Sequence, residues 1–436
     1  MSNNQKIYIY SDEVSIRLIY TLDIIFRDRG IKYQIINDPV VFEETDAPKF
    51  VYSDKPFKNS YFTISPTELL FEEDIKKQRV SNGTWEGLEL LTFRNKPDIL
   101  ASIFYVISLY QEYLSDKKDM HNRAYAKENI LEQNGWLEKL MIERWSVKFI
   151  SLLEKKLDII LEKKEIPFKL IPTFDIDNTY AYKLKSKFRN TLSTGKDVLK
   201  FDVNRIKERK RVLSNEQKDP YDTFETILSI KKHGFDVKLF WLLGDFANHD
   251  RNISYQNDEH RKLIYKLSKE LEIGLHPSYK SNEVLGNLKL EKERLASILE
   301  RDVSFSRQHF LRLNLPTTYE QLIKEGFTDD YTLGFAEKVG FRAGIARPFP
   351  WFNLKKNEIT QLNLHPFTYM DGTLNEYLNL SIEEATKKVS QLMDEVKLYG
   401  GDFICIWHNE TISSYGKWEG WKSVLDHTIQ EASSNK

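Results

Sequence analysis

From residue 168 to the C-terminus, short apolar segments alternate with longer segments whose apolar residues have helical spacing. The segments "FKLIPTF", "DVKLFWLLG" and "FICIWHN" have the length and composition of buried strands. Stretches such as "DEHRKLIYKLSKELE" and "SIEEATKKVSQLMDEVKLYG" have the pattern of amphipathic helices. Repeated strand–helix units favour parallel strands covered by helices. About seven such units within roughly 270 residues predict an α/β fold with a closed or nearly closed, distorted parallel β/α barrel.

The residues before this region have a different pattern and predict a second unit. A strand-like "KIYIYS", an amphipathic helix that ends at Gly30 and a strand-like "IKYQIIND" come first, and several shorter strands follow. A charged helical stretch then leads into the barrel region. Because 436 residues is long for one core, we expect an α/β domain over residues 1–120, a helical connector over 121–165 and the barrel over 166–436.

Composition excludes several classes of protein. The formal net charge is -1 and the pI about 6.8, so no global positive field favours nucleic acid. The single cysteine, Cys405, excludes an intramolecular disulfide and a metal cage of several thiolates, and we expect it to be a small buried hydrophobic residue. The N-terminus lacks the pattern of a signal peptide, and no apolar run is long enough to cross a membrane. We therefore expect a soluble cytoplasmic protein.

Polar residues follow the predicted strands at the points where each strand ends. In a parallel barrel these ends converge on one opening, the mouth, where the active sites of such enzymes lie. Asp175 and Asp177 stand one residue apart there, and two bare carboxylates would repel each other. A divalent cation and a cationic neighbour would allow both to stay ionised. The whole set of strand-end residues comprises Asp175, Asp177, Asp245, His276, Arg307, His309, Asp330 and His408.

This set has the composition of a hydrolytic site. One aspartate can bind metal together with imidazoles, which gives the mixed oxygen and nitrogen ligands that zinc accepts. The other can act as general base, kept deprotonated by the metal and by Arg307, on a water whose pKa the metal lowers. His408 can protonate the leaving group. The expected reaction is hydrolysis of an amide or an ester.

Five segments of the chain carry a family resemblance. They are, in order, "TFDID" (173–177), "EIGLHPSY" (272–279), "SRQHF" (306–310), "DDYTLGF" (329–335) and "ICIWHN" (404–409). Over residues 168–436 the chain resembles the polysaccharide deacetylases of the NodB-homology fold, carbohydrate esterase family 4 in the broad sense. The phrases "EIGLHPSY" and "GFRAG" are similar to a divergent bacterial branch that has an extra N-terminal α/β domain.

The resemblance implies roles for individual residues. Asp175 matches the catalytic base, Arg307 the arginine that holds it, and His408 the catalytic acid. Asp177 and His276 match metal ligands. The family's second metal histidine falls on Lys280, and histidine replaces proline in "RQH".

We expect His309 to supply the third ligand, because alternation along a strand would point it to the same face as Arg307. The metal would be zinc, or else cobalt or nickel. The competing expectation is a mouth without metal, in which the Lys280 ammonium offsets part of the carboxylate charge.

Other residues are candidates for substrate contact. Tyr279, Asp330 and Trp407 are expected to touch the substrate, and the aromatic rings among them, with those of Trp351 and Phe352, could stack on sugar rings. A polar cluster of Asp119, His121 and Arg123 forms either a loop network or a contact that leans over the mouth. Arg342, which lies between glycines, fits a structural turn or an anion contact.

The segment 182–219 carries twelve Lys or Arg against five Asp or Glu. It is either a solvent-exposed insertion between the first strand and its helix, or a segment that contacts an anionic substrate or membrane surface. Together these features predict a hydrolase that removes acetyl groups from an N-acetylated sugar or glycan precursor. The alternatives are a metal-independent hydrolase of C–N bonds with the same fold and a catalytically silent carbohydrate-binding protein.

Overall fold

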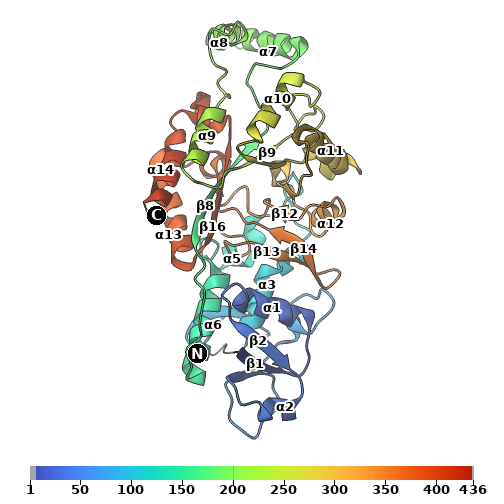
Figure 1. Cartoon of the computed structure of the whole chain (residues 1–436), viewed down its shortest axis with the longest axis vertical. Coiled ribbons are helices and arrows are strands. Elements are labelled where there is room, and N and C mark those ends of the chain that lie inside the picture. Colours follow the sequence, from blue (N-terminus) through green and yellow to red (C-terminus); the bar gives the residue numbers. More distant parts are fainter. Residues whose placement is uncertain (1–5, 200, 435–436) are drawn as a thin grey trace.

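The computed structural model describes residues 6–199 and 201–434. The ends of the expected first and last domains, and Lys200 of the basic segment, lie outside this part. A small parallel sheet lies at one end of the elongated molecule and a larger sheet in its middle, as Figure 1 shows. The helices α7 (Lys187–Leu199) and α8 (Val203–Leu213) project from the opposite end.

The N-terminal sheet has four parallel strands in the order β2-β1-β3-β4. Helix α1 (Ile16–Phe26) follows β1 and begins at Ser15, whose hydroxyl accepts a hydrogen bond from the backbone N–H of Leu18. The strands are β1 (Lys6–Ser11), β2 (Lys32–Ile36), β3 (Lys49–Tyr52) and β4 (Thr63–Ile64).

An antiparallel sheet and several helices complete the N-terminal part. The long helix α6 (Met141–Leu157) packs on both sheets, because Phe149 contacts Phe26 and Phe50, and the indole N–H of Trp145 donates to the carbonyl of Glu89 at 2.8 Å. The other elements are α2 (Pro39–Glu44), β5 (Val80–Trp85), β6 (Leu88–Phe93), β7 (Lys96–Pro97), α3 (Ile99–Ile107), α4 (Tyr110–Leu114) and α5 (Ile130–Gln133). The division at residues 120 and 165 stays a prediction.

The larger sheet has nine strands in the order β13-β14-β12-β11-β10-β9-β8-β16-β15. All of its pairings are parallel except that of β13 with β14. This arrangement agrees with the strand–helix pattern of the sequence. The strands are β8 (Phe168–Ile176), β9 (Lys238–Trp241), β10 (Glu272–Leu275), β11 (Phe305–Ser306), β12 (Asp329–Asp330), β13 (Phe349–Asn353), β14 (Glu358–Leu364), β15 (Tyr369–Met370) and β16 (Gly401–His408).

Helices cover the outer face of this sheet. Their buried side chains form one hydrophobic cluster with the outward-facing residues of the strands. These helices are α9 (Phe224–Lys232), α10 (Asp258–Leu267), α11 (Asn287–Leu299), α12 (Thr317–Lys324), α13 (Ile382–Tyr399) and α14 (Lys422–Ser433). The helices α7 (Lys187–Leu199) and α8 (Val203–Leu213) lie instead on the projection and are called here the hairpin.

Side-chain alternation gives the two faces of the sheet different roles. Along β8, Phe174 joins the outer cluster, whereas Asp175 points to the concave face. Along β16, His408 lies on the concave face and Trp407 is fully buried in the outer cluster, where its indole N–H donates to the hydroxyl of Tyr369. The sugar contact expected for Trp407 is therefore wrong, because its ring faces the core. Cys405 is buried on the same outer face, and burial raises the pKa of its thiol to about 12.

The sheet is curled but not closed, which agrees with the nearly closed, distorted form of the barrel expected from the sequence and not with the closed form. Among the described residues no strand pairing joins the edge strands β13 and β15. Irregular backbone between β12 and β13 spans this side, since the N–H of Gly340 donates to the carbonyl of Thr368 and the N–H of Asp402 to that of Ala346. A loop thus completes the wall that a continuous ring of strands would have provided.

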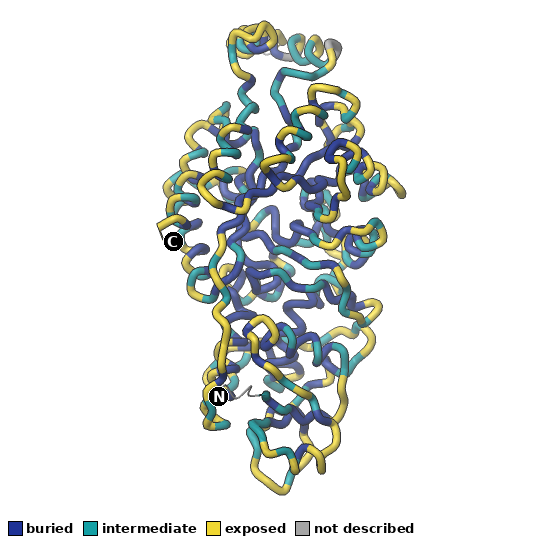
Figure 2. Tube along the Cα trace, in the orientation of Figure 1, coloured by how far each residue is buried: buried dark blue, intermediate teal, exposed yellow. Residues whose placement is uncertain are grey.

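The N-terminal part and the larger sheet share one buried junction, visible as the dark central trace in Figure 2. The hydroxyl of Tyr20 donates to the carbonyl of Pro350 at 2.8 Å, and Arg342 forms an ion pair with Glu112. Trp351 and Phe352 are buried here rather than exposed to a sugar, so stacking on substrate is excluded for both. Of the two readings for Arg342, the structural one agrees with its contacts.

Candidate active site

A cleft of about 430 Å³ opens at the C-terminal ends of the central strands. Five of the expected strand-end residues line it: Asp175, Asp177, His276, His309 and His408. Asp175 and His408 are direct partners in the parallel register of β8 and β16, so their backbones lie about 5 Å apart. This is close enough for both side chains to act on one substrate group.

Asp175 is held by a buried arginine. Its Oδ1 accepts a hydrogen bond of 2.8 Å from Nη1 of Arg307, which also donates to the hydroxyl of Thr173. The guanidinium is fully buried and lies 4.2 Å from the ring centre of Phe240. The structure thus provides the cationic neighbour that the sequence required.

The tautomer of His276 is fixed by the backbone. Its Nδ1 lies 2.6 Å from the carbonyl oxygen of Arg307. Because a carbonyl only accepts, Nδ1 carries the proton and donates. The Nε2 atom therefore faces Oδ1 of Asp177, at 3.2 Å.

His309 is oriented in the same way by a carboxylate. Its Nδ1 donates to Oδ1 of Asp250 at 2.9 Å, and the buried Asp250 also accepts from the backbone N–H groups of Tyr279 and Lys280. Burial raises the pKa of Asp250, but hydrogen bonds from His309 and the backbone outweigh it and lower the pKa. The Nε2 atom of His309 is left facing Oδ2 of Asp177, at 3.3 Å. Asp250 was missed in the sequence because it lies in a loop with no pattern.

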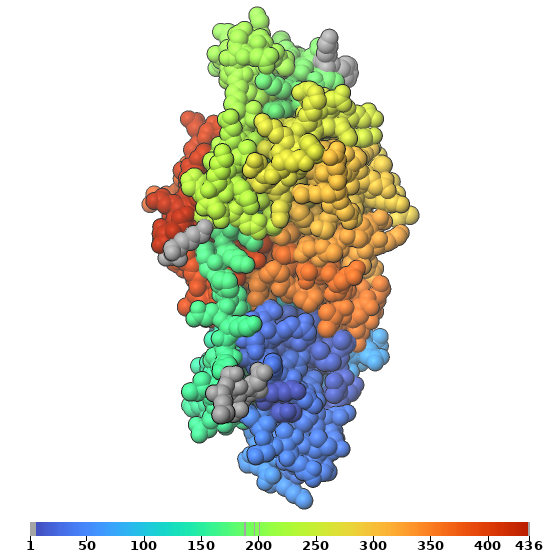
Figure 3. All heavy atoms as spheres, in the orientation of Figure 1, coloured from blue at the N-terminus to red at the C-terminus, as the bar shows by residue number. Residues whose placement is uncertain are grey.

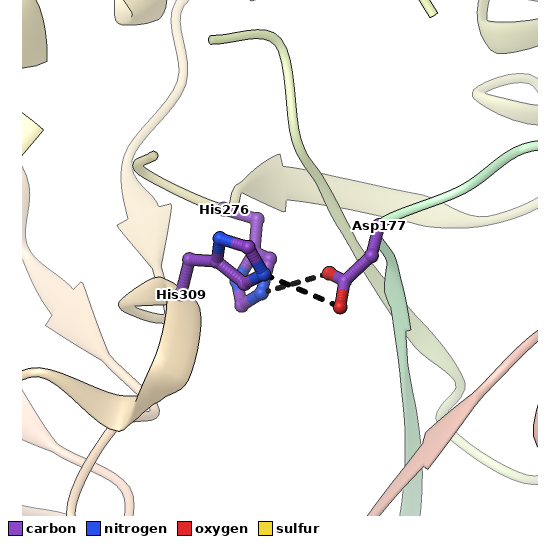
Figure 4. Close-up of side chains that lie close together, drawn as sticks. All are labelled: Asp177, His276 and His309. Carbon is purple, nitrogen blue, oxygen red and sulfur yellow. Dashed lines mark ion pairs between the residues drawn. The ribbon is translucent and has the colours of Figure 1, made fainter. Parts of the chain in front are cut away.

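The side chains of Asp177, His276 and His309 point toward one another, as Figure 4 shows. Their potential ligand atoms lie within 4.8 Å of one another. Oδ1 of Asp177 is buried and has no hydrogen-bond partner among the described residues. Ligand atoms about 2.1 Å from a tetrahedral zinc are about 3.4 Å apart, close to the observed separations. The three residues therefore fit a divalent cation.

The electrostatics of this group agree with a site for positive charge. Burial raises the pKa of Asp177, but the two imidazoles outweigh it and hold the pKa well below its usual range. Burial likewise lowers the pKa of His309, but Asp177 and Asp250 outweigh it and raise the pKa to about 9. In the chain without metal, a protonated His309 thus takes the place of the cation beside Asp177.

Two sequence arguments about this group need correction. Lys280 is exposed, so its ammonium does not offset the carboxylates. His309 does not lie on a strand with Arg307, because β11 ends at Ser306 and a short 3-10 turn follows. Gln308 between them is nevertheless extended, and the N–H groups of Arg307 and His309 donate to alternate carbonyls of the neighbouring segment, those of Leu275 and Pro277. The alternation expected from the sequence therefore still directs both side chains toward the two aspartates.

His408 is supported by a second buried carboxylate. Its Nδ1 lies 3.0 Å from both oxygens of Asp371, which also accepts from the hydroxyl of Thr411. Burial would lower the pKa of His408, but the charge of Asp371 outweighs it and holds the pKa well above its usual value. The Nε2 atom faces the cleft, 3.8 Å from Oδ2 of Asp177. Asp371 ends the short strand β15 in "YMDG", a strand-end acid that could have been found.

Residues from outside the sheet form part of the cleft wall. Arg123 comes from the N-terminal part and donates to the carbonyl of Phe310 at 3.0 Å and to the hydroxyl of Tyr377 at 3.2 Å. The cluster with Asp119 thus leans over the mouth, as one reading of the sequence allowed. Arg205 of α8 also lines the cleft. Aromatic rings missed in the sequence complete the wall: Tyr221, Tyr377, Tyr415 and Trp418.

Three other expected mouth residues lie elsewhere. Asp330 is fully buried and accepts hydrogen bonds from Ser306 and Thr332, so it supports the sheet rather than contacting substrate. Tyr279 does not line the cleft; its ring stacks on His249 and its hydroxyl contacts Nδ1 of His121. Asp245 is exposed and pairs with Arg294.

Comparison with protein families gives a match for the N-terminal part. Residues 7–158 match the model of a family of unknown function, DUF7033. This match covers less than half of the chain, and it extends through helix α6. No curated protein matches the sequence.

Several solved structures are similar to the chain, and each of those named here covers 62% of it. A protein from Mycobacterium smegmatis described as a polysaccharide deacetylase has 13% identity and a TM-score of 0.40 over 91% of its own length. A polysaccharide deacetylase from Bacillus cereus has 12% identity and a TM-score of 0.31 over 88%. The catalytic domain of a peptidoglycan N-acetylglucosamine deacetylase from Eubacterium rectale has 11% identity and a TM-score of 0.30 over 89%. Because these sequence identities and TM-scores are low, function has to be argued from the residues of the chain itself.

Proposed function

We propose that the chain is a metal-dependent hydrolase that removes acetyl groups from an N-acetylated sugar or glycan precursor. One observation carries this proposal. The Nε2 atoms of His276 and His309 face the carboxylate of Asp177, while the Nδ1 protons of both rings are committed to other acceptors. Three ligand atoms then meet at one point of the cleft wall, beside a carboxylate and an imidazole.

Asp177, His276 and His309 would hold the divalent ion, zinc or else cobalt or nickel. Three protein ligands are typical of a catalytic zinc site, which keeps a further position open. When bound, the ion would polarise an acyl carbonyl and make a nearby water easier to deprotonate. The acceptors behind both imidazoles orient the rings and raise their basicity.

Asp175 would act as the general base. Arg307 occupies its Oδ1, and Oδ2 lies 3.8 Å from Nε2 of His276, beside the proposed ligands. A carboxylate fixed in place by a buried arginine can accept a proton from the attacking water without moving. Arg307 acts through Asp175 and is a positioning residue.

His408 would act as the general acid. Asp371 holds its Nδ1 and favours the imidazolium, so Nε2 carries a proton at the cleft. Proton donation to the leaving nitrogen allows the C–N bond to break once water has added to the carbonyl. The rings of Tyr377 and Trp418 line the same cleft and offer surfaces on which a sugar could stack.

Metal analysis combined with acetate release tests the proposal. The purified chain is loaded with zinc, cobalt or nickel, and metal stoichiometry is measured for wild type, His309→Ala and the exposed-site control Lys280→Ala. Acetate release is then followed on a panel of N-acetylated sugars. We expect one ion in wild type and in the control, loss of the ion in His309→Ala, and metal-dependent release of acetate.

Other outcomes would favour the alternatives. Acetate release that does not change after metal removal would indicate a metal-independent hydrolase. One bound ion without turnover on any substrate, together with sugar binding, would indicate a silent carbohydrate-binding protein. Unchanged metal content in His309→Ala would remove His309 from the ligand set.

A further inference from the structure

The hairpin stands away from the body of the molecule and carries exposed apolar side chains. Figure 3 shows it as a projection beyond the rest of the surface. Phe201 is 89% exposed and Leu199 80%, and Leu192, Val198 and Val203 are each more than half exposed. The apolar tip consists of Leu192, Val198, Leu199, Phe201 and Val203.

These apolar residues do not hold the hairpin together. Its two helices are joined by a buried ion pair of 2.6 Å between Asp197 and Arg209, and Arg209 also donates to the hydroxyl of Thr194. Phe201 and Leu199 belong to none of the hydrophobic clusters of the described residues. Phe201 also has a φ of +55°, where a residue with a side chain is disfavoured and glycine or asparagine is usual. Among the described residues, no contact within the hairpin accounts for a phenylalanine at this turn.

The charge of the same region is strongly positive. Residues 182–219 contain twelve Lys or Arg against five Asp or Glu, an excess of seven positive charges. Since the formal net charge of the chain is -1, the other residues carry an excess of eight negative charges. Lys207, Lys210 and Arg211 of α8 are exposed close to the apolar tip in the sequence. The molecule thus concentrates positive charge and apolar surface in one projecting element.

We propose that the hairpin is a membrane-binding element that inserts its apolar tip into the interface of an anionic bilayer. Apolar side chains gain free energy at the boundary between headgroups and acyl chains, and flanking basic residues are attracted to anionic lipids. Charge complementarity disfavours the pairing of two hairpins, which carry the same sign of charge, and favours an anionic surface as the occupant. No described helix is long and apolar enough to cross a membrane, so the contact is peripheral.

The hairpin also connects this contact to the cleft. Arg205 lines the cleft and lies on α8, two residues after Val203 of the apolar tip. The hydroxyls of Tyr182 and the cleft residue Tyr415 are 3.0 Å apart and join the base of the hairpin to the cleft wall. Binding through the tip would therefore hold the cleft close to the bilayer. The inference concerns binding alone and does not rest on the proposed activity.

Vesicle sedimentation tests it with the full-length chain. One set of vesicles is phosphatidylcholine alone and the other is an equimolar mixture of phosphatidylcholine and phosphatidylglycerol. We expect binding to the anionic vesicles that weakens as salt increases, and little binding to the neutral ones. Equal binding to both sets, or binding to neither, would overturn the proposal.

Variants separate the apolar and the electrostatic contributions. Joint Leu199→Ser, Phe201→Ser and Val203→Ser removes apolar area, with Ile160→Ser and Leu285→Ser as a control at two exposed apolar residues elsewhere. Joint Lys207→Glu, Lys210→Glu and Arg211→Glu reverses charge, with Lys324→Glu and Lys387→Glu as a control. We expect each hairpin variant to lower partitioning by about 100-fold or more and the controls to leave it nearly unchanged. Equal losses in the controls would contradict a specific contact.

A single-cysteine probe tests insertion directly. Because Cys405 is the only cysteine and is fully buried, Asn204→Cys at the tip and Leu285→Cys elsewhere can each be labelled with a polarity-sensitive dye. We expect a blue shift on anionic vesicles for the dye at residue 204 alone. Tip-dependent dimerisation in sedimentation velocity without a vesicle effect would assign the tip to a second copy and overturn the proposal. Binding of duplex DNA that survives the serine substitutions, without a vesicle effect, would also overturn it.

Discussion

The N-terminal sheet and the larger sheet both have aspartates at the C-terminal ends of parallel strands, but the partners of these acids differ. At the N-terminal sheet, Asp12 pairs with Lys55 at 2.6 Å and Asp54 with Lys96 at 2.8 Å. Serine hydroxyls donate to both acids. All four charged side chains are more than a third exposed. Flexible ammonium groups in water thus neutralise this edge.

At the larger sheet the acids are held by rigid and mostly buried groups. Asp175 contacts a guanidinium that is fully enclosed, and Asp177 faces two imidazole nitrogens with no hydrogen bond to its Oδ1. Topology places acids at both edges, but only burial and fixed partners make an acid available for chemistry. A strand-end aspartate is therefore weak evidence for a site until its neighbours are known.

The largest expected difference between the edges concerns turnover. Asp175→Asn removes the proposed base while keeping the shape of the side chain, and we expect acetate release to fall by about 10²–10⁴-fold or more. Metal content should stay near the wild-type value, because Asp177, His276 and His309 are intact. Asp12→Asn, the matched change at the other edge, should leave turnover unchanged. Activity of Asp175→Asn close to wild type would remove the base assignment.

The second difference is the pH dependence of stability, which should have opposite signs at the two edges. Burial raises the pKa of Asp330 to about 6, whereas the Lys96 ammonium lowers the pKa of Asp54. A raised pKa means that Asp330 stabilises the fold at low pH and that this contribution is lost as pH rises through about 6.

We expect the difference in unfolding free energy between wild type and Asp330→Asn to fall by about 3 kcal/mol from about pH 4 to about pH 7. For Asp54→Asn the corresponding difference should increase with pH, because a lowered pKa gives stability that is lost on acidification. Urea unfolding at several pH values measures both. If the two free-energy differences changed with pH in the same direction, the proposed contrast between the two edges would be contradicted.

A smaller effect, on metal affinity, is expected for Asp250, the carboxylate that accepts a hydrogen bond from the proposed ligand His309. Asp250→Asn weakens the acceptor that orients His309, and we expect metal affinity to fall by about 10–100-fold. Competition with a chelator measures the change. The control is Asp12→Asn, which should leave metal affinity unchanged. Loss of affinity in the control would mean that the protein had been disturbed as a whole.

The difference between the edges was only partly readable in the sequence. The strand–helix pattern and the strand-end positions of Asp175, His276 and His408 are local features, so pattern and resemblance were sufficient to predict them. Strand alternation predicts that His309 faces the same way as Arg307, and this holds because Gln308 between them is extended, although β11 itself ends at Ser306. The sequence does not decide between a closed and a nearly closed barrel, because a loop without periodicity fills the gap between the edge strands.

Other site features depend on contacts between distant segments, which local spacing does not reveal. Asp250 lies 59 residues before the histidine that it orients, and Arg123 reaches the cleft from the N-terminal part. The prediction for Trp407 failed for a different reason. It stands next to His408 in the sequence, but alternation puts the two side chains on opposite faces of β16. A neighbour in sequence was thus taken for a neighbour in the site.

The smallest expected effect is at the N-terminal edge, where Lys96→Ala removes the ion pair with Asp54. The two side chains are 37% and 60% exposed, so water replaces most of what the pair provides, and Ser65 still donates to Asp54. We expect unfolding free energy to change by less than about 1 kcal/mol, and the change to shrink further as salt screens the pair. Urea unfolding at low and high salt measures both quantities. A loss of several kcal/mol that does not respond to salt would mean that the acids at this edge are held as rigidly as those at the larger sheet. Solvent exposure would then fail to explain why the acids of one edge are reactive and those of the other are not.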